Sequence, residues 1–465
     1  MKPSTEKKKL IRSLDDVIEY LPFYNLFTVK AICLANIPTF ISGFVLYINV
    51  LIAPALQCEL NLTTFEVTLI SITFFIGEAL GSWYWGRMAD VYGRKKTLIV
   101  AVTFQVYFVL LSVASDSYVL HVVLRFLVGV GYGGCIVLTV VYSTEFTSRR
   151  NHAKAVLFLN DIFIFGSLAA IGVSYFTLTL YGWRNFILWS ILPYILLICL
   201  MLLMPESIRF LSINGETDKV SDMLDEIAMT SIITLPANFH GEEISTGRHI
   251  TKGQSPGYFT VFTKHWKKIL GLSINGVPIF LSFYGIPFFI DYKIQHPSSC
   301  GFNDATVMMK CAPLTDSQIL RSFWINFGLL PGSIIGYFVV EKQGRKILLG
   351  FTTILMAISY LTQLLCLPSV MTYVLLFLSS GFGSSSTCFL FLFSSELFPT
   401  NIRSTASGIS ATIWKVFSIL SPLLFQHLIY IEWNFVVVFM GSLSVLGIVG
   451  LGLLPETLGQ NLNDY

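Results

Sequence analysis

Residues 86–96 read GRMADVYGRKK, and residues 341–346 read EKQGRK. Both segments hold an acidic residue three positions before a glycine that two basic residues follow, and the acidic residues, Asp90 and Glu341, are 251 positions apart. Two further pairs repeat at nearly the same spacing: Glu145 with Glu396 at 251 positions, and Glu206 with Glu456, each after a proline, at 250. Three nearly equal spacings do not arise by chance, so we predict two parallel copies of one structural unit.

The composition is typical of a chain that lies mostly in lipid. Of its 465 residues, 54% are apolar and 12% are charged, against about 25% charged in soluble domains. A formal net charge of +3 gives no case for nucleic acid as a partner. The sequence contains no pattern of a catalytic triad, a phosphate-binding loop or a metal cluster. We therefore expect no enzyme activity, no cofactor and no bound metal.

Twelve segments are long and apolar enough to cross the lipid bilayer, which takes about 20 residues of helix. Helices are expected because lipid offers no hydrogen-bond partner to an unpaired backbone group. The expected spans are 27–54, 64–86, 97–115, 118–142, 154–180, 184–204, 268–290, 318–340, 347–367, 370–394, 404–430 and 433–454.

The spans form two sets of six around the longest charged connection, residues 205–267. We expect an all-α membrane protein in which residues 27–204 and 268–454 form two six-helix halves. Residues 1–26 precede the first half, and residues 455–465 form a tail. In a parallel repeat of this kind the substrate site lies near mid-membrane, between the halves.

Basic residues in the connections predict the orientation. With the N-terminus inside, 24 of the 30 Lys and Arg residues lie on the inner side and three on the outer side. Cytoplasmic connections carry such an excess, so we place both termini in the cytoplasm. The membrane is either the plasma membrane or that of an intracellular vesicle. On the outer side, Asn61 begins a glycosylation sequon that we expect to stay unused. Cys300 and Cys311 are candidates for a disulfide in an oxidising compartment, with Cys58 as a competing partner.

Longer motifs along the whole chain resemble the major facilitator superfamily. Residues 86–95 are similar to its loop 2–3 motif, and residues 125–134 (RFLVGVGYGG) to its span 4 motif. PESIRF at 205–210 and PETLG at 455–459 resemble the ends of spans 6 and 12 in the sugar and organic-ion branch. Within that branch the chain most resembles the synaptic vesicle glycoprotein group and its SVOP-type relatives, through APALQCE at 53–59, FTKH at 262–265 and ELFPTNIR at 396–403.

The resemblance implies a secondary-active or facilitative transporter of a small organic solute, working by alternating access with a proton or ion as coupling partner. Residues 275–282 (NGVPIFLS) lack the paired glutamines of sugar facilitators, which argues against a sugar. Lys415 favours an anion or a zwitterion, and we expect a monomer. The alternative is a regulatory or binding protein of a vesicle or other membrane with little transport. Ser42 and Val45, where SVOP-type proteins carry acids, favour that alternative.

Four charged residues inside the spans are the main candidates for substrate binding or coupling: Glu78, Arg125, Asp161 and Lys415. Each costs about 2.5–3.5 kcal/mol at mid-membrane on insertion scales, so each is a functional hypothesis. Their charges sum to zero, which indicates internal pairing. The resemblance implies that Lys415 occupies a basic family position that faces the central cavity, and for this residue a structural pair with Asp161 or Glu78 competes with a substrate role. For Arg125, holding helices together competes with proton relay, and for Asp161, reaching back to the inner surface competes with a site role.

Aromatic residues are candidates to line an apolar cavity. For any one of them, lipid contact or packing is the competing interpretation. The candidates are Phe40, Phe44, Tyr47, Phe283, Tyr284 and Trp414, of which Tyr284 and Trp414 join the predicted binding set.

The motif at residues 86–95 is expected to be a conformational latch, a role implied by the resemblance. Gly86 would let two helices approach closely, and Gly93 would let the chain turn tightly. Asp90 would pair with Arg94 or with a neighbouring helix N-terminus.

A weaker copy of this latch is expected in the second half, from Glu341, Gly344 and Arg345. Glu145 and Glu396 each lie near basic residues after an inner helix end, so Glu396 and Arg403 are predicted to form a switch ion pair. Such pairs would break and re-form as the halves rock.

Overall fold

A computed structural model describes residues 25–148, 151–230, 258–296, 314–339, 343–365, 367–398 and 403–456. Within these ranges the regular structure is entirely helical. The helices of the first half and the central connection are α2 (Leu26–Ala35), α3 (Ile37–Glu59), α4 (Thr64–Tyr92), α5 (Arg94–Leu111), α6 (Tyr118–Glu145), α7 (His152–Met201), α8 (Ile208–Ile213) and α9 (Thr217–Thr230). Those of the second half are α11 (Tyr258–Gln295), α12 (Asp316–Phe327), α13 (Leu329–Val339), α14 (Arg345–Leu361), α15 (Ser369–Leu397), α16 (Arg403–Ser418), the π-helix η4 (Leu423–Leu428), α17 (Ile429–Ile431) and α18 (Trp433–Gly452).

Eleven helical segments among the described residues are long and apolar enough to cross a membrane. One of them, Lys154–Met201, is 48 residues long and contains Gly182 with non-helical backbone angles. This single break separates the expected spans 154–180 and 184–204, so the described helices agree with a twelve-span fold.

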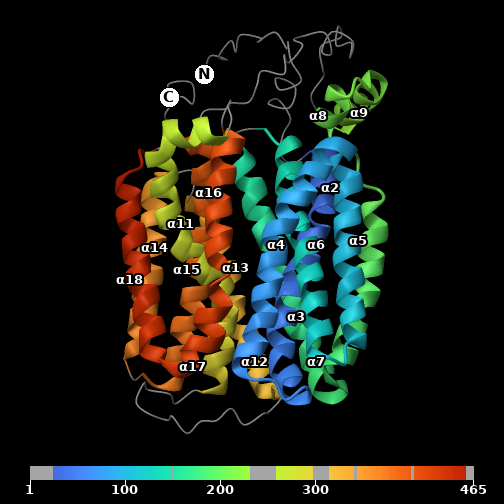
Figure 1. Cartoon of the computed structure of the whole chain (residues 1–465). Coiled ribbons are helices and arrows are strands. Elements are labelled where there is room, and N and C mark those ends of the chain that lie inside the picture. The colour runs from blue at the N-terminus through green and yellow to red at the C-terminus, as the bar shows by residue number, and fades with distance from the viewer. Residues whose placement is uncertain are drawn as a thin grey trace, which may run out of the picture.

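The helices form two bundles that lie side by side (Figure 1). In the first bundle α3 packs on α7, α4 on α6 and α5 on α6. In the second bundle the equivalent pairs, α11 with α16, α13 with α15 and α14 with α15, pack in the same way. The repeat of 251 residues in the sequence is therefore also a repeat of helix contacts.

Glycines permit the close contact between α4 and α6. A Cβ atom on Gly129 would lie 2.9 Å from the carbonyl carbon of Phe74, and one on Gly133 would lie 2.9 Å from that of Glu78. The glycine-rich segment of span 4 thus brings two backbones together, as small residues do in membrane helices.

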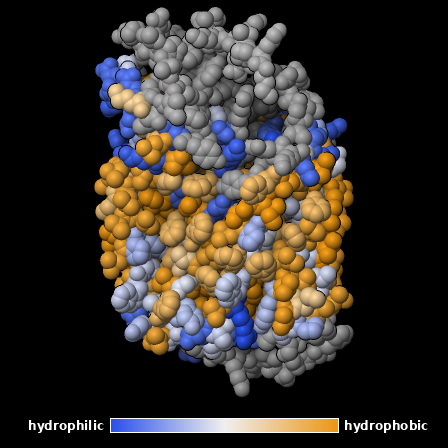
Figure 2. Space-filling view, turned by 180° about the vertical axis from the view of Figure 1, so that it is seen from behind, coloured by the Kyte–Doolittle hydropathy of each residue, from blue (hydrophilic) through white to orange (hydrophobic). Residues whose placement is uncertain are grey.

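Large apolar side chains cover the outside of the helical body. Figure 2 shows hydrophobic residues spread over the middle of the molecule. Exposed examples come from both halves: Trp83, Phe176, Leu192, Phe338, Val370 and Val449. An exposed apolar surface this broad fits a lipid environment.

We name the end with Arg94 and Arg345 the basic end, and the end with Glu59 and Arg184 the opposite end. At the basic end, the central helix α9 packs on α2, where the Asn25 amide donates to the carbonyl of Ile227 at 3.5 Å. At the opposite end, Arg184 forms ion pairs with Glu59 and Asp116. Cys58, the competing candidate, is disulfide-bonded there, while the predicted pair of Cys300 and Cys311 lies outside the described residues.

Candidate functional site

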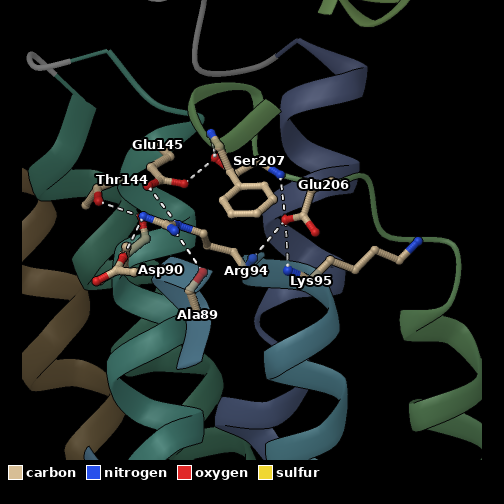
Figure 3. Close-up of polar contacts among 10 residues, drawn as sticks. Ala89, Asp90, Arg94, Lys95, Thr144, Glu145, Glu206 and Ser207 are labelled. Atoms are coloured by element: carbon tan, nitrogen blue, oxygen red, sulfur yellow. Dashed lines mark hydrogen bonds and ion pairs between the residues drawn. The ribbon is translucent and has the colours of Figure 1, made fainter. Parts of the chain in front are cut away.

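A charged cluster at the basic end of the first half joins three connections (Figure 3). Arg94 pairs with Asp90 at 3.0 Å and with Glu145 at 3.4 Å. Glu145 also accepts a hydrogen bond from the Ser207 hydroxyl. Glu206 accepts from the backbone amides of Arg94 at 2.9 Å and Lys95 at 3.0 Å. These two bonds place a carboxylate on the N-terminus of α5, where amides and the helix dipole favour an anion.

The described residues of the second half repeat several of these contacts. Arg345 pairs with Glu396 at 3.2 Å, as Arg94 pairs with Glu145. Glu456 accepts from the backbone amide of Lys346 at 3.4 Å, as Glu206 accepts from that of Lys95. The ammonium groups of both lysines also donate to backbone carbonyls, Lys95 to Leu202 at 2.9 Å and Lys346 to Leu454 at 2.6 Å.

One member of the predicted second latch and one member of the predicted switch ion pair lie outside this description. Glu341 falls among the residues that are not described, and so does the side chain of Arg403. The predicted pair of Glu396 with Arg403 therefore stays a prediction. The described partner of Glu396 is Arg345, from the neighbouring connection.

Gly93 and Gly344 leave room for the two capping carboxylates. A Cβ atom on Gly93 would lie 3.1 Å from the carboxyl carbon of Glu206, and one on Gly344 would lie 2.8 Å from that of Glu456. Gly93 also has φ 100° and ψ 157°, backbone angles that residues other than glycine rarely adopt. Gly344 has φ −59°, so its conformation is ordinary. The tight turn predicted at Gly93 is present. At Gly344 the backbone would accept other residues, and glycine is needed only because a Cβ atom would collide with the Glu456 carboxylate.

The close helix approach expected at Gly86 is absent from this structure. A Cβ atom placed on Gly86 meets no atom within 4 Å. One turn further along α4, the side chain of Asp90 is 72% exposed. No atom of the described residues lies within 4 Å of a Cβ position on Gly86, so its latch role would require a different arrangement of the halves.

Near the middle of the spans, an ion pair joins the two halves. The Lys415 ammonium on α16 lies 3.3 Å from a carboxylate oxygen of Glu78 on α4 and donates to the Ser82 hydroxyl at 2.7 Å. The Tyr284 hydroxyl on α11 donates to the same Glu78 oxygen at 3.0 Å. The side chain of Glu78 is 1% exposed and that of Lys415 is 14% exposed. Of the two acids that the sequence offered as partners for Lys415, the structure pairs it with Glu78.

Asp161 takes part in a second polar contact between the halves. Its carboxylate on α7 accepts from the Ser333 hydroxyl on α13, and the neighbouring Asn160 donates to the Ser384 hydroxyl on α15 at 3.0 Å. Beside Ser384, a cavity of about 10 Å³ is lined by residues of both halves, among them Tyr47, Phe163 and Phe283. A space of this size holds about one water molecule. The halves are therefore almost in direct contact at this level.

Arg125 and Trp414 lie within their own halves. Arg125 is fully buried and donates to the His121 ring at 3.2 Å, while its two terminal nitrogens find no hydrogen-bond partner among the described residues. Trp414 is fully buried and stacks on Phe280 with ring centroids 5.3 Å apart. The ring of Trp414 thus packs in the core of the second half, although its neighbour Lys415 reaches the first half. The binding roles predicted for both residues remain untested.

Three functional candidates did not emerge from the sequence. Glu206 and Glu456 belong to the repeat in the sequence. Only the structure shows that they cap helices, because their carboxylates lie against the N-termini of α5 and α14. Ser82 had no signal of its own. It lies one helical turn after Glu78, so the i, i+4 spacing from an intramembrane acid could have marked it.

Comparison with known proteins shows the family. The model of the family described as "Sugar (and other) transporter" matches residues 39–465. The chain belongs to this family.

Curated relatives extend the match over nearly the whole chain. The "Synaptic vesicle 2-related protein" of Pongo abelii is 24% identical over 97% of this chain and 82% of its own length. The "Putative transporter svop-1" of Caenorhabditis elegans is 25% identical over 99% and 88%. The "Organic cation/carnitine transporter 7" of Arabidopsis thaliana is 26% identical over 89% and 88%.

Solved structures confirm the fold. The proton:xylose symporter XylE bound to 6-bromo-6-deoxy-D-glucose superimposes with a TM-score of 0.71 at 20% identity, covering 95% of this chain and 99% of that one. An inward-open conformation of XylE from E. coli gives a TM-score of 0.73 at 18% identity, covering 94% and 98%. The chain is a multi-pass membrane protein with the major facilitator fold, and its resemblance to SVOP-type proteins is confirmed.

Proposed function

We propose that this chain moves a small organic anion or zwitterion across a membrane by alternating access. The ion pair between Glu78 and Lys415 carries the proposal. It connects opposite halves of a transporter fold near mid-membrane, which is where substrate sites of this fold lie. Intramembrane charges are unfavourable, and they mark substrate or ion pathways when they face the interior of a bundle.

The contacts between the halves support one of the two access states. Near the opposite end, the side chains of Tyr47 and Asn326 are hydrogen-bonded across the halves, and Thr64 contacts His427 at 3.4 Å. At the basic end, no atom in the part of the chain that the structure describes comes within 4 Å of a Cβ position on Gly86. This pattern supports a state closed at the opposite end and accessible from the basic end. If the basic end lies in the cytoplasm, as the Lys and Arg distribution predicts, the state faces inward.

The proposed substrate class rests on the charge of Lys415 and on the segment of α11 that begins at Asn275. Asn275 begins the segment that replaces the paired glutamines of sugar facilitators, and its amide donates to the carbonyl of Gly447 at 3.2 Å. That side chain is thus engaged in packing α11 on α18. The relative named as an organic cation/carnitine transporter supports an organic ion. The relatives named for synaptic vesicles support a vesicle membrane.

The test is a comparison of four charge classes on the purified full-length chain. Benzoate, carnitine, tetraethylammonium and glucose represent an anion, a zwitterion, a cation and a neutral sugar. Melting temperatures are measured for the wild type, for Lys415→Gln and for Lys219→Gln, which alters an exposed lysine on α9 that pairs with Glu216. A ligand at 100 times its Kd stabilises the folded state by about 2.7 kcal/mol.

We expect benzoate or carnitine to stabilise the wild type and Lys219→Gln but not Lys415→Gln, and the same compound to enter liposomes that contain the wild type. Stabilisation without uptake would favour the regulatory or binding protein on the same scaffold. Stabilisation by tetraethylammonium or glucose alone, or equal effects in wild type and Lys415→Gln, would refute the proposal.

A further inference from the structure

The two members of the central ion pair differ in their access to solvent. Glu78 is 1% exposed, whereas Lys415 is 14% exposed. On α16, Gly408 lies seven residues before Lys415 and therefore on nearly the same helix face, and a Cβ atom placed there meets no atom within 4 Å. On α4, Gly86 follows Ser82 by one turn and is equally open. A ligand that arrives from the basic end can reach the ammonium before it reaches the carboxylate.

Glu78 has few groups around it that can share its charge. From α16 the titratable group that faces it is Lys415, and from α11 it is Tyr284, which donates to it at 3.0 Å. From α6, Tyr132 lies close enough to interact electrostatically with Glu78 and with Tyr284. Ser82, on α4 itself, donates to the Glu78 backbone carbonyl at 2.7 Å. Lys415 is thus the single cation described in contact with the Glu78 carboxylate.

A substrate carboxylate on Lys415 would compete with Glu78. Two carboxylates that share one buried ammonium repel each other, and an ionised carboxylate without a partner is strongly unfavourable away from water. Such a group becomes neutral by taking up a proton. A protonated Glu78 could then donate to the Tyr284 oxygen, because a phenol accepts as well as donates a hydrogen bond.

We infer that Glu78 occupies the place of a substrate carboxylate in the empty transporter, and that the chain carries one monocarboxylate together with one proton. The inference rests on the proposed transport function and deepens it. One Lys415 cation balances one anion in either state, so the loaded site is electrically neutral. A dicarboxylate would leave an excess negative charge. Aromatic rings lie beside the ion pair: the ring centroids of Phe75 and Tyr284 are 5.0 Å apart. They favour a substrate whose part beyond the carboxylate is apolar or aromatic.

The inference is tested by supplying the missing carboxylate. Glu78→Gln keeps the size of the side chain but leaves Lys415 without its anion. Acetate and benzoate are titrated against the melting temperature of full-length wild type, Glu78→Gln, and the double variant Glu78→Gln with Lys415→Gln. The matched control is Glu66→Gln, the same change on the same helix at an exposed cap, where the glutamine can still accept from Thr63. Methylammonium chloride controls for ionic strength.

We expect Glu78→Gln to bind benzoate at least tenfold more tightly than the wild type at pH 7.5, with the same affinity between pH 6 and 8. In the wild type and in Glu66→Gln, the affinity should fall with rising pH, by up to tenfold per unit, because binding takes up one proton. The double variant should bind neither probe. Equal affinities in wild type and Glu78→Gln, an unchanged pH dependence in Glu78→Gln, or binding by the double variant would overturn the inference.

Uptake into liposomes separates this inference from the proposed function. If the chain transports, a proton gradient should drive benzoate accumulation in the wild type and not in Glu78→Gln, which should still exchange benzoate across the membrane. Transport that a proton gradient does not drive in the wild type would overturn the coupling while the proposed function stands. If binding follows the pattern above but neither protein moves benzoate, carnitine or acetate, the competition at Lys415 stands and the transport function fails.

Discussion

The two repeats allow the effect of the same glycine-to-alanine substitution on stability to be compared at two equivalent positions. Gly93→Ala and Gly344→Ala introduce the same methyl group at equivalent turns, each directly before a helix that a carboxylate caps. Only Gly93 has a backbone conformation, φ 100° and ψ 157°, that is almost restricted to glycine. Gly344, with φ −59°, accommodates alanine without backbone strain. We therefore expect Gly93→Ala to destabilise the protein more than Gly344→Ala.

The magnitude follows from two contributions. Backbone strain at Gly93 costs about 1–3 kcal/mol. The new Cβ atom also displaces the Glu206 carboxylate, whose bonds to the amides of Arg94 and Lys95 measure 2.9 and 3.0 Å. A bond to a charged group contributes about 1.5–3 kcal/mol, so Gly93→Ala should cost about 2.5–6 kcal/mol if one bond is lost. At Gly344 the strain is absent and the capping bond is 3.4 Å long, so we expect about 1–2 kcal/mol.

The assay is thermal unfolding of the purified variants in one detergent, with Gly93→Asn as a third variant. Asparagine tolerates the left-handed helical region, but ψ 157° lies outside that region, so Gly93→Asn should be no more stable than Gly93→Ala. The reasoning fails if Gly344→Ala lowers the melting temperature as much as Gly93→Ala does, or if asparagine restores wild-type stability.

Two other predictions concern contacts within the first half. Gly133→Ala should destabilise the protein by about 1–3 kcal/mol because its Cβ atom overlaps the backbone at Glu78, whereas Gly172→Ala, where a Cβ atom meets nothing within 4 Å, should be neutral or stabilising in the same thermal assay. Arg94→Ala and Glu145→Ala should give a coupling energy of about 0.5–3 kcal/mol in a double-mutant cycle on melting data, and additive effects would show that their 3.4 Å contact contributes nothing.

The sequence offered Arg94 as a partner for Asp90, four residues away, but it did not reveal the latch contacts between distant segments. Glu396 pairs with Arg345, a residue 51 positions earlier in the chain, and the sequence did not predict this contact. In the same way, Glu206 caps α5 from 112 positions away. Spacing along one helix or loop predicts neighbours three or four residues apart, whereas these contacts depend on how three connections meet at one end of the bundle.

The four intramembrane charges illustrate the same limit. The sequence identified all four, because an ionisable residue in an apolar span is conspicuous in any reading of hydropathy. It left open which of two acids serves Lys415, and packing decides for Glu78, because α16 and α4 meet across the halves. Tyr284 was one of several aromatic candidates, and only its contact with Glu78 sets it apart from Trp414, which packs within its own half.

By itself, the sequence determined the fold class, the twelve spans, the parallel repeat and the family, because these depend on apolar segment length and on motifs that recur at a fixed spacing. The tertiary structure decided which charges meet and which glycines are in contact. Those features depend on distances between helices that are far apart in the chain. Gly86 and Gly129 look alike in the sequence, yet only Gly129 touches a neighbouring backbone.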